Sequence, residues 1–270
     1  MSVVKVMDEQ GLKFLVDLVD AAGNVIMEIY AKREALQHVV KKDDSPLTAA
    51  DLASNEVLSE GLRMRWPQIP VLSEESANTF SKDECPVMYW AVDPLDGTKE
   101  FIKGNGEFTV NISLVVNGEP QVGVVGAPAL GLMYVGAFGG ACSFVAQAKK
   151  RDANGWREIK VSGASAESLT NRPVRVATSR SHPSNELTKW LEQFDAVDGR
   201  DIGSSLKFCL VAEGQVDVYP RFGPTCIWDT AAGHALVVAA GGHVQQPGGE
   251  SLNYPKPSNT LNPFFLALGY

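Results

Sequence analysis

The chain has 270 residues, of which 44% are hydrophobic and 21% are charged, and its formal net charge is -8. These proportions are typical of a folded globular protein and exclude a disordered or fibrous one. The negative charge disfavours nonspecific binding to DNA or RNA, because such binding depends on Lys and Arg side chains that neutralise phosphates. The length fits one large domain or two modest ones, at roughly 150 residues per domain.

A long amphipathic helix is the first element predicted along the chain. Apolar residues recur at helical spacing from Leu12 to Ile29, which is the pattern of a helix with one buried face. A second helix is predicted to start near Thr48, and Ser45-Pro46 marks a loop between the two helices.

From Ile69 onward, short apolar runs replace the helical pattern and predict strands. Asn117-Gly118 lies between two Val-rich runs and predicts a hairpin with a type I′ turn, in which both central residues need positive φ. The uncharged stretch 124–146 contains several glycines and Pro128, which favours short buried strands over a membrane-spanning helix. This half is therefore predicted to consist of helices packed on an antiparallel sheet.

The second half of the chain alternates between strand and helix patterns. Strands are predicted at 174–179 and 215–220, and helices at 184–194, 204–214 and 228–242. Such alternation predicts a smaller α/β half. We place the boundary within 149–172, which gives an N-terminal domain of residues 1–160 and a C-terminal domain of residues 161–270.

The cysteines and the first residues of the chain indicate a cytoplasmic location. Cys85, Cys142, Cys209 and Cys226 show no CxxC spacing, so we interpret them as reduced thiols without a metal or catalytic role. The first ten residues lack the apolar core of a secretory signal.

Several predicted apolar runs end in acidic residues, which are the candidate metal ligands. They are Asp51, Glu74, Glu75, Asp93, Asp96 and Asp229. Carboxylates without a nearby His or Cys favour Mg²⁺, Mn²⁺ or Ca²⁺ over zinc. The loop patterns of an EF-hand and of a P-loop are both absent from the sequence.

Each acidic residue also has a purely structural interpretation. Asp51 fits a helix capping box with Thr48, Asp229 could cap its own helix, and the two glutamates could be a solvated pair. In the stretch VDPLDGTKEF, Val92 to Phe101, Pro94 fixes φ and Gly97 allows close backbone approach. Local propensity leaves open whether its two aspartates hold a metal ion or only shape a turn.

The strings LSEES, DPLDGT and WDTAAG together resemble the metal-binding motifs of the inositol monophosphatase superfamily of lithium-sensitive, Mg²⁺-dependent phosphatases. The longer strings DGTKEFIKGNGEFTVNI, SRSH, GSSLKFCLVAEGQ and YPRFGPTCIWDTAAGHA are similar to its bacterial 3'(2'),5'-bisphosphate nucleotidase branch. The resemblance spans nearly the whole chain from residue 44 onward. It implies an α/β (α+β) fold, the layered α-β-α-β-α sandwich of that superfamily.

The resemblance also implies roles for individual residues. The implied metal ligands are Glu74, Asp93, the Leu95 carbonyl, Asp96 and Asp229, and all of them except Asp93 also face the substrate. Asp51 and Thr98 would activate the attacking water, and the amides of Gly97 and Thr98 would hold the phosphate being cleaved. The residues implied to contact the rest of the substrate, including a second phosphate, are His182, Ser204, Lys207 and Arg221.

These basic side chains have structural interpretations as well. Lys207 could extend to the surface from an apolar helix, Arg221 could be an exposed loop charge, and His182 beside a turn could be structural. Lys99 and Glu100 help to mark the nucleotidase branch, but the sequence assigns them no physical role.

The predicted function is a cytoplasmic phosphomonoesterase that converts adenosine 3',5'-bisphosphate into AMP and phosphate. By the same resemblance it uses two or three Mg²⁺ ions, with Mn²⁺ as a substitute, also acts on 3'-phosphoadenylyl sulfate and serves sulfur assimilation. The resemblance is compatible with a homodimer and with peripheral association at the cytoplasmic face of the inner membrane. One alternative is an inositol monophosphate phosphatase. The other is a nonenzymatic nucleotide sensor, which would not need the water-activating pair Asp51 and Thr98.

Overall fold

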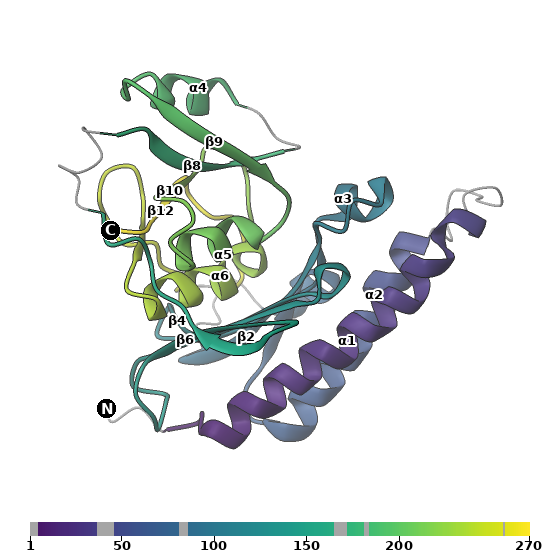
Figure 1. Cartoon of the computed structure of the whole chain (residues 1–270). Helices are drawn as coiled ribbons and strands as arrows, with labels where there is room; N and C mark the ends of the chain where they lie inside the picture. Colours follow the sequence, from purple (N-terminus) through teal and green to yellow (C-terminus); the bar gives the residue numbers. More distant parts are fainter. Residues whose placement is uncertain (1–4, 37–45, 81–85, 165–171, 181–183, 256) are drawn as a thin grey trace.

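Helices and sheets alternate in layers in this computed structural model. It describes residues 5–36, 46–80, 86–164, 172–180, 184–255 and 257–270. A pair of long helices lies on one face of a large sheet, two further helices lie between that sheet and a smaller one, and a short helix lies beyond the smaller sheet (Figure 1). This α-β-α-β-α order confirms the predicted sandwich.

The first helix layer and the large sheet come from the N-terminal part of the chain. The helices are α1 (Glu9–Leu36) and α2 (Pro46–Arg65). The sheet has the order β1-β2-β3-β4-β5-β6-β7, in which β1 and β2 are parallel and the other neighbours are antiparallel. Its strands are β1 (Val71–Ser73), β2 (Met88–Asp96), β3 (Thr109–Val116), β4 (Glu119–Ala127), β5 (Leu132–Ala137), β6 (Gln147–Asp152) and β7 (Gly155–Glu158).

Two predictions for this half are confirmed, and one is corrected. Asn117 and Gly118 have φ of 51 and 82, as the predicted hairpin turn requires. The stretch 124–146 contains strand residues of β4 and β5 joined by η2 (Pro128–Leu130), and none of the helices in the described ranges is long and apolar enough to cross a membrane. The second helix begins at Pro46 rather than near Thr48, so the predicted start is two residues late.

The second half contains the inner helices, the smaller sheet and the outer helix. The helices are α4 (Asn185–Leu191), α5 (Leu206–Ala212) and α6 (Ile227–Ala239). The sheet has the order β11-β12-β10-β8-β9, with strands β8 (Val174–Ser179), β9 (Val197–Ile202), β10 (Val218–Arg221), β11 (His243–Gln245) and β12 (Phe265–Leu268). All five elements predicted for this half are present, and the division at residues 160 and 161 stays a prediction.

Two glycines allow α6 to lie directly against the large sheet. A Cβ atom added to Gly123 in β4 would lie 2.2 Å from the Ala232 carbonyl oxygen, and one added to Gly136 in β5 would lie 2.4 Å from Leu236 Cα. No real Cβ atom approaches backbone this closely, so any larger residue would push the helix away from the sheet. The position of α6, which carries Asp229, therefore depends on these two glycines.

We predict that Gly136→Ala lowers the free energy of unfolding by about 1–3 kcal/mol, because the added methyl group overpacks the contact with α6. Urea denaturation of the purified variant measures this change. Gly199→Ala in β9 is the matched control, since no heavy atom lies within 4 Å of its added Cβ, and its effect should stay within about 0.5 kcal/mol. Equal stability of the two variants would contradict the proposed close packing.

Candidate metal and phosphate site

A β-bulge at the end of β2 turns two aspartates to the same side of the sheet. In a regular strand, side chains alternate, so residues three apart point to opposite faces. Here Asp93 pairs with Asn111 and Asp96 pairs with Thr109, so three steps along β2 face two steps along β3. Pro94 is tolerated inside the bulge because β1 pairs with β2 only before Asp93. The segment is thus a strand end, which the turn interpretation did not anticipate.

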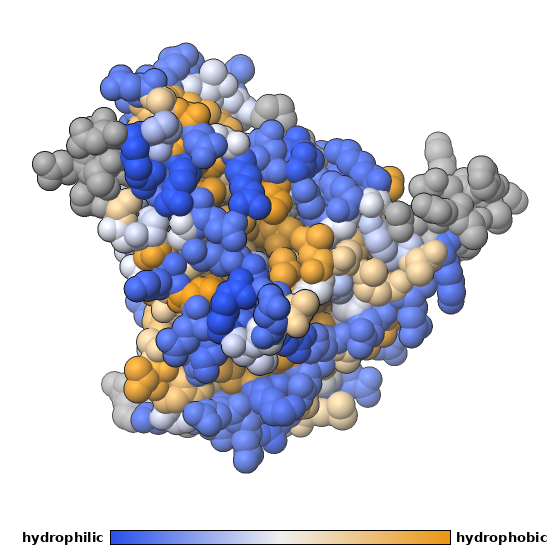
Figure 2. All heavy atoms as spheres, viewed as in Figure 1, coloured by the Kyte–Doolittle hydropathy of each residue, from blue (hydrophilic) through white to orange (hydrophobic). Residues whose placement is uncertain are grey.

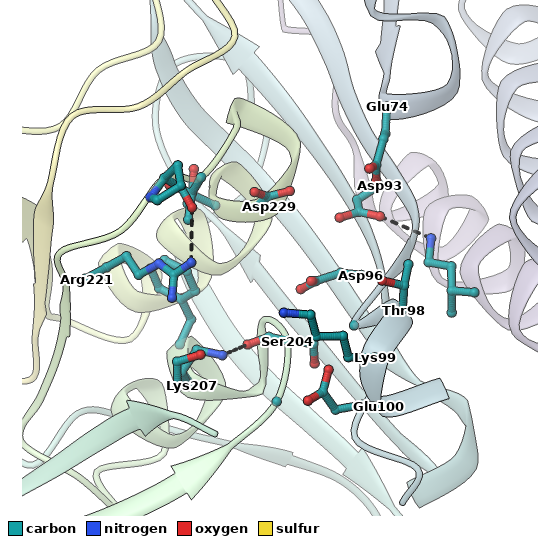
Figure 3. Close-up of a pocket in the computed structure, with 18 of the residues that line it drawn as sticks. Glu74, Asp93, Asp96, Thr98, Lys99, Glu100, Ser204, Lys207, Arg221 and Asp229 are labelled. Carbon is teal, nitrogen blue, oxygen red and sulfur yellow. Dashed lines mark hydrogen bonds between the residues drawn. The ribbon is translucent and has the colours of Figure 1, made fainter. Parts of the chain in front are cut away.

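Predicted metal ligands from three separate parts of the chain line one pocket of about 270 Å³. Glu74 begins the short helix η1 (Glu74–Thr79) directly after β1, Asp93 and Asp96 end β2, and Asp229 lies in the first turn of α6. Figure 3 shows the four carboxylates around this pocket. The sequence left their convergence open, and the structure brings them together.

The remaining predicted site residues fall into three groups. Those that line the same pocket are Leu95, Gly97, Thr98, Ser204, Lys207 and Arg221. Asp51 is not part of this lining: it is buried in α2, near enough to Glu75 and Glu74 for their charges to act on it. His182 lies outside the described residues.

Gly97 links the bulge to the short helix α3 (Thr98–Lys103). It caps the helix with φ of 96, a left-handed conformation that glycine adopts without steric cost. A Cβ atom here would lie 3.1 Å from the Glu107 carbonyl oxygen. Thr98 lies exposed at the first position of this helix.

Each aspartate in the pocket accepts hydrogen bonds from the protein. Asp93 Oδ1 accepts from the Leu95 amide at 3.1 Å. Asp229 Oδ2 accepts from the Cys226 amide at 2.7 Å, so Asp229 does cap α6 and lines the pocket as well. These hydrogen bonds hold the carboxylates in place while leaving further lone pairs to accept a ligand.

Ser205 supports Asp96 and was not identified from the sequence. Its hydroxyl lies 3.1 Å from Asp96 Oδ2 and receives a hydrogen bond of 3.0 Å from Asn111 Nδ2. Both hydrogen bonds of Ser205 depend on the tertiary fold, because α5 brings Ser205 next to β3 only in the folded protein. Nothing in the sequence indicates this role for Ser205 except its position next to Ser204.

Burial and mutual repulsion raise the pKa values of the acidic residues. Burial, followed by the charges of Asp96, Glu74 and Asp229, raises the pKa of Asp93 well above its usual value. Burial and Asp96 raise the pKa of Asp229 to about 7. Burial, with Glu75 and Glu74, raises the pKa of Asp51 to about 7. The charged forms of these groups are therefore costly until a cation offsets them.

The donor chemistry fits a hard divalent cation. The candidate ligands are carboxylates and the carbonyl of Leu95, which are the oxygen donors that Mg²⁺ prefers. Within the described ranges, no three Asp, Glu, His or Cys side chains form a finished ligand set. The acidic side chains line the pocket but do not converge on one position. One reason is that their like charges repel at short range, and another is that Asp229 accepts a hydrogen bond from the Cys226 amide.

The opposite side of the pocket carries two cations that are not exposed. Lys207 is 5% exposed, donates to the Ser204 carbonyl at 2.5 Å and lies 5.4 Å from the centre of the Tyr219 ring. Burial lowers its pKa to about 8. Arg221 ends β10 half-buried and donates from Nη2 to the Pro224 carbonyl at 3.0 Å. The surface interpretations of both residues are therefore wrong.

Two polar atoms on this side have no partner in the described part of the chain. They are Ser204 Oγ and Arg221 Nε, and both atoms are buried. Ser204 also has an unusual φ of 47. Buried polar atoms are nearly always hydrogen-bonded in folded proteins, so unpaired donors in a pocket wall indicate a ligand that supplies acceptors.

Comparisons with known proteins point to one family. A model of the inositol monophosphatase family matches residues 7–264. The 3'(2'),5'-bisphosphate nucleotidase CysQ of Salmonella typhimurium is 49% identical over 249 residues, which cover 92% of this chain and 96% of that protein. Among solved structures, CysQ from Bacteroides thetaiotaomicron has 35% identity and a TM-score of 0.81, with 97% of both chains covered. An inositol monophosphatase from Anabaena has 29% identity and a TM-score of 0.72, with 97% of this chain and 91% of that chain covered.

We predict that Mg²⁺ stabilises the protein more at pH 7.5 than at pH 5. The folded-state pKa values of Asp51 and Asp229, about 7, exceed the unfolded value of about 3.9. The metal-free fold therefore binds more protons than the unfolded chain and loses stability as pH rises from about 4 to about 7. A hundredfold excess of Mg²⁺ over its Kd adds about 2.7 kcal/mol, a rise in Tm of roughly 5–10 °C.

Thermal melts with EDTA and with Mg²⁺ at the two pH values measure this difference. Asp195→Asn, at an exposed position outside the pocket, should leave the Mg²⁺ response unchanged, whereas Asp96→Asn should reduce it. An equal rise in Tm at both pH values would contradict the assignment of these acids to a metal site.

Proposed function

The chain belongs to the inositol monophosphatase family, and we propose that it is a metal-dependent 3'(2'),5'-bisphosphate nucleotidase that converts adenosine 3',5'-bisphosphate into AMP and phosphate. The observation that carries this proposal is the two-sided pocket: carboxylates on one wall, and Lys207, Arg221 and the unpaired Ser204 hydroxyl on the other. A simple monophosphate needs only the first wall. The names of the CysQ relatives support the same activity.

The carboxylate wall would hold the cations. We propose Glu74, Asp93, the Leu95 carbonyl, Asp96 and Asp229 as ligands for two or three Mg²⁺ ions, with Mn²⁺ as a substitute. When bound, such ions attract the substrate phosphate and make a water molecule more nucleophilic. Most of the lowering of the barrier is expected from this kind of fixed electrostatics, since phosphate monoesters hydrolyse extremely slowly without catalysis.

Thr98 and Asp51 would orient the attacking water and accept its proton. Thr98 is exposed at the pocket wall, where its hydroxyl can accept a hydrogen bond from water, and the amides of Gly97 and Thr98 would hold the phosphate being cleaved. Between Thr98 and Asp51, both of which the structure describes, no hydrogen bond is formed. Catalytic hydrogen bonds often tighten only with substrate bound, so the proposed relay requires the two residues to approach in the complex.

The cationic wall would bind the second phosphate. Ser204 Oγ and Arg221 Nε are donors without a partner among the described atoms, and Lys207 is held next to them by the Ser204 carbonyl. The charged donors of Lys207 and Arg221 form strong hydrogen bonds to phosphate oxygens, and the Ser204 hydroxyl can add a neutral one. His182 is also proposed to contact the substrate, on the basis of the sequence resemblance alone.

The proposal extends to the biological setting. We expect the enzyme to act on 3'-phosphoadenylyl sulfate as well, to serve sulfur assimilation, to be inhibited by lithium and to work in the cytoplasm, free or bound peripherally to the inner membrane. Of the cysteines in the described ranges, Cys142, Cys209 and Cys226 are all free thiols, which is consistent with a reducing compartment. A homodimer is part of the same proposal.

We predict that the protein, with Mg²⁺ present, turns over adenosine 3',5'-bisphosphate with a kcat/KM at least tenfold higher than that for inositol 1-phosphate. The physical reason is the second phosphate, which only the nucleotide can offer to Lys207 and Arg221. Phosphate release from the two compounds measures the ratio. Preference for the inositol ester would favour an inositol monophosphate phosphatase, and no release with any divalent metal would favour a nonenzymatic nucleotide sensor.

Two substitutions should distinguish the roles of the two pocket walls in turnover and in substrate binding. Asp96→Asn should reduce turnover at least a hundredfold, because the neutral amide weakens cation binding, and added Mg²⁺ should restore part of it.

Arg221→Ala should raise KM for the bisphosphate about tenfold or more with little change in kcat, which is the expected cost of a charged hydrogen bond to phosphate. Arg200→Ala, at an exposed position on β9, is the control and should change neither parameter. An unchanged kcat in Asp96→Asn would refute the site.

A further inference from the structure

Lys99 and Glu100 line the pocket, although the proposed chemistry does not use them. They form the first turn of α3, directly after the proposed phosphate-binding residues Gly97 and Thr98. Glu100 is 4% exposed, whereas Lys99 is exposed at the pocket wall. Figure 3 shows the Lys99 ammonium group pointing into the pocket. Both residues belong to the strings that mark the nucleotidase branch.

The first turn of α3 lies directly against the turn that carries Ser204. A Cβ atom added to Gly203 would lie 2.6 Å from Glu100 Cγ and 2.6 Å from the Glu107 carbonyl oxygen. The Gly203 amide also donates to Glu107 Oε2 at 2.9 Å. The residue after Lys99 therefore packs against the turn that carries Ser204, and both Lys99 and Ser204 line the pocket.

An ion pair links the segment after α3 to the residues just before Ser204. Arg180, which follows β8, donates from Nε to Glu107 Oε2 at 2.9 Å and from Nη2 to Glu107 Oε1 at 2.8 Å. The same Nη2 reaches the Asp201 carbonyl at 2.6 Å, two residues before Gly203. A bidentate pair of this kind adds geometric precision as well as energy, so the segment that follows α3 is tied to the residues just before Ser204.

The charges on this side suggest a task for Lys99. Lys207 and Arg221 supply two positive charges, and Glu100 is near enough to Lys207 to act on its titration. A phosphate monoester carries a charge of about −1.5 to −2 near neutral pH. Because the acids Asp96, Glu100 and Glu107 all act on Lys207, Lys207 and Arg221 alone do not match the charge of a phosphate dianion. Lys99 adds a third cationic side chain to this wall.

We propose that Lys99 is a specificity residue whose ammonium group binds the second phosphate of a bisphosphate ligand, together with Ser204, Lys207 and Arg221. This inference rests on the proposed nucleotidase function and deepens it. Gly97 and Thr98 then hold the phosphate being cleaved, and the next residue along the chain holds the other phosphate. The ligand class is a nucleotide with phosphates on two different ribose oxygens.

The test compares Lys99→Ala, Lys99→Arg and Lys103→Ala with the wild type, all with Mg²⁺ present. Lys103 is the matched control, because it lies in the same helix and is exposed but does not line the pocket. The ligands are adenosine 3',5'-bisphosphate, adenosine 3'-monophosphate, AMP and inorganic phosphate. Turnover is measured for the first two, and equilibrium binding by calorimetry for the last two.

Lys99→Ala should raise KM for the bisphosphate and Kd for AMP about tenfold, the effect of one lost charge-assisted hydrogen bond. Kinetics with adenosine 3'-monophosphate and binding of inorganic phosphate should change less than about twofold. Lys99→Arg should recover most of the affinity, and Lys103→Ala should match the wild type. Thermal melts establish that each variant is folded.

Two results overturn the assignment in different ways. If Lys99→Ala weakens the monophosphate and the bisphosphate equally, or weakens inorganic phosphate as much as AMP, Lys99 acts on the phosphate being cleaved. If it changes none of the four ligands, it has no binding role. Failure of the wild type to cleave the bisphosphate would refute the nucleotidase function instead, and the AMP binding data would still report on Lys99 independently.

Discussion

The accumulation of negative charge at the end of β2 is the constraint on which the rest of the molecule depends. Asp93, Asp96 and Asp229 are brought together at the meeting point of β2, β3 and α6, where burial makes every charged carboxylate costly. A fold optimised only for stability would keep such groups apart. The bulge in β2 and the glycines beneath α6 do the opposite, since both bring carboxylates into one pocket.

Nearby hydrogen-bond donors reduce the free-energy cost of burying these carboxylates but do not remove it. Ser205 and Asn111 form a short hydrogen-bonded chain to Asp96, and the N-terminus of α6 supplies the Cys226 amide to Asp229. These donors favour the charged forms of the acids, while burial opposes them. The balance leaves the carboxylate wall of the pocket rich in oxygen acceptors and without a cation of its own, which favours binding of a divalent cation there.

The sequence predicted the elements whose local pattern determines them. The apolar period of α1, the Asn117-Gly118 turn and the alternating elements after Val174 all follow from neighbouring residues. β9 was not predicted because nearly all of its residues are exposed, which removes the alternation that identifies a strand. The pairs β6–β7 and β11–β12 were missed for related reasons, since polar or very short strands are defined mainly by their partners in the sheet.

For the site, residue types could be predicted but their geometry could not. The strings around Glu74, Asp93 and Asp229 indicated metal ligands, yet their convergence depends on pairings between segments far apart in sequence. The bulge follows from the register of β2 against β3, and the support by Ser205 follows from the packing of α5. Lys207 was ambiguous because a lysine in an apolar helix can extend to solvent, and only tertiary structure showed that it is buried.

One short segment, residues 97–107, connects the two walls of the pocket. Its beginning supplies Gly97 and Thr98 to the carboxylate side, and its end supplies Glu107 to the Gly203 amide on the cationic side. Any displacement of α3 therefore changes both walls at once. Under the proposed function, the carboxylate wall would serve the chemistry common to phosphate esters. A substrate with two phosphates would have to match the spacing between the walls that the contacts of Glu107 with Arg180 and Gly203 help to set, so this spacing would account for the choice among such esters.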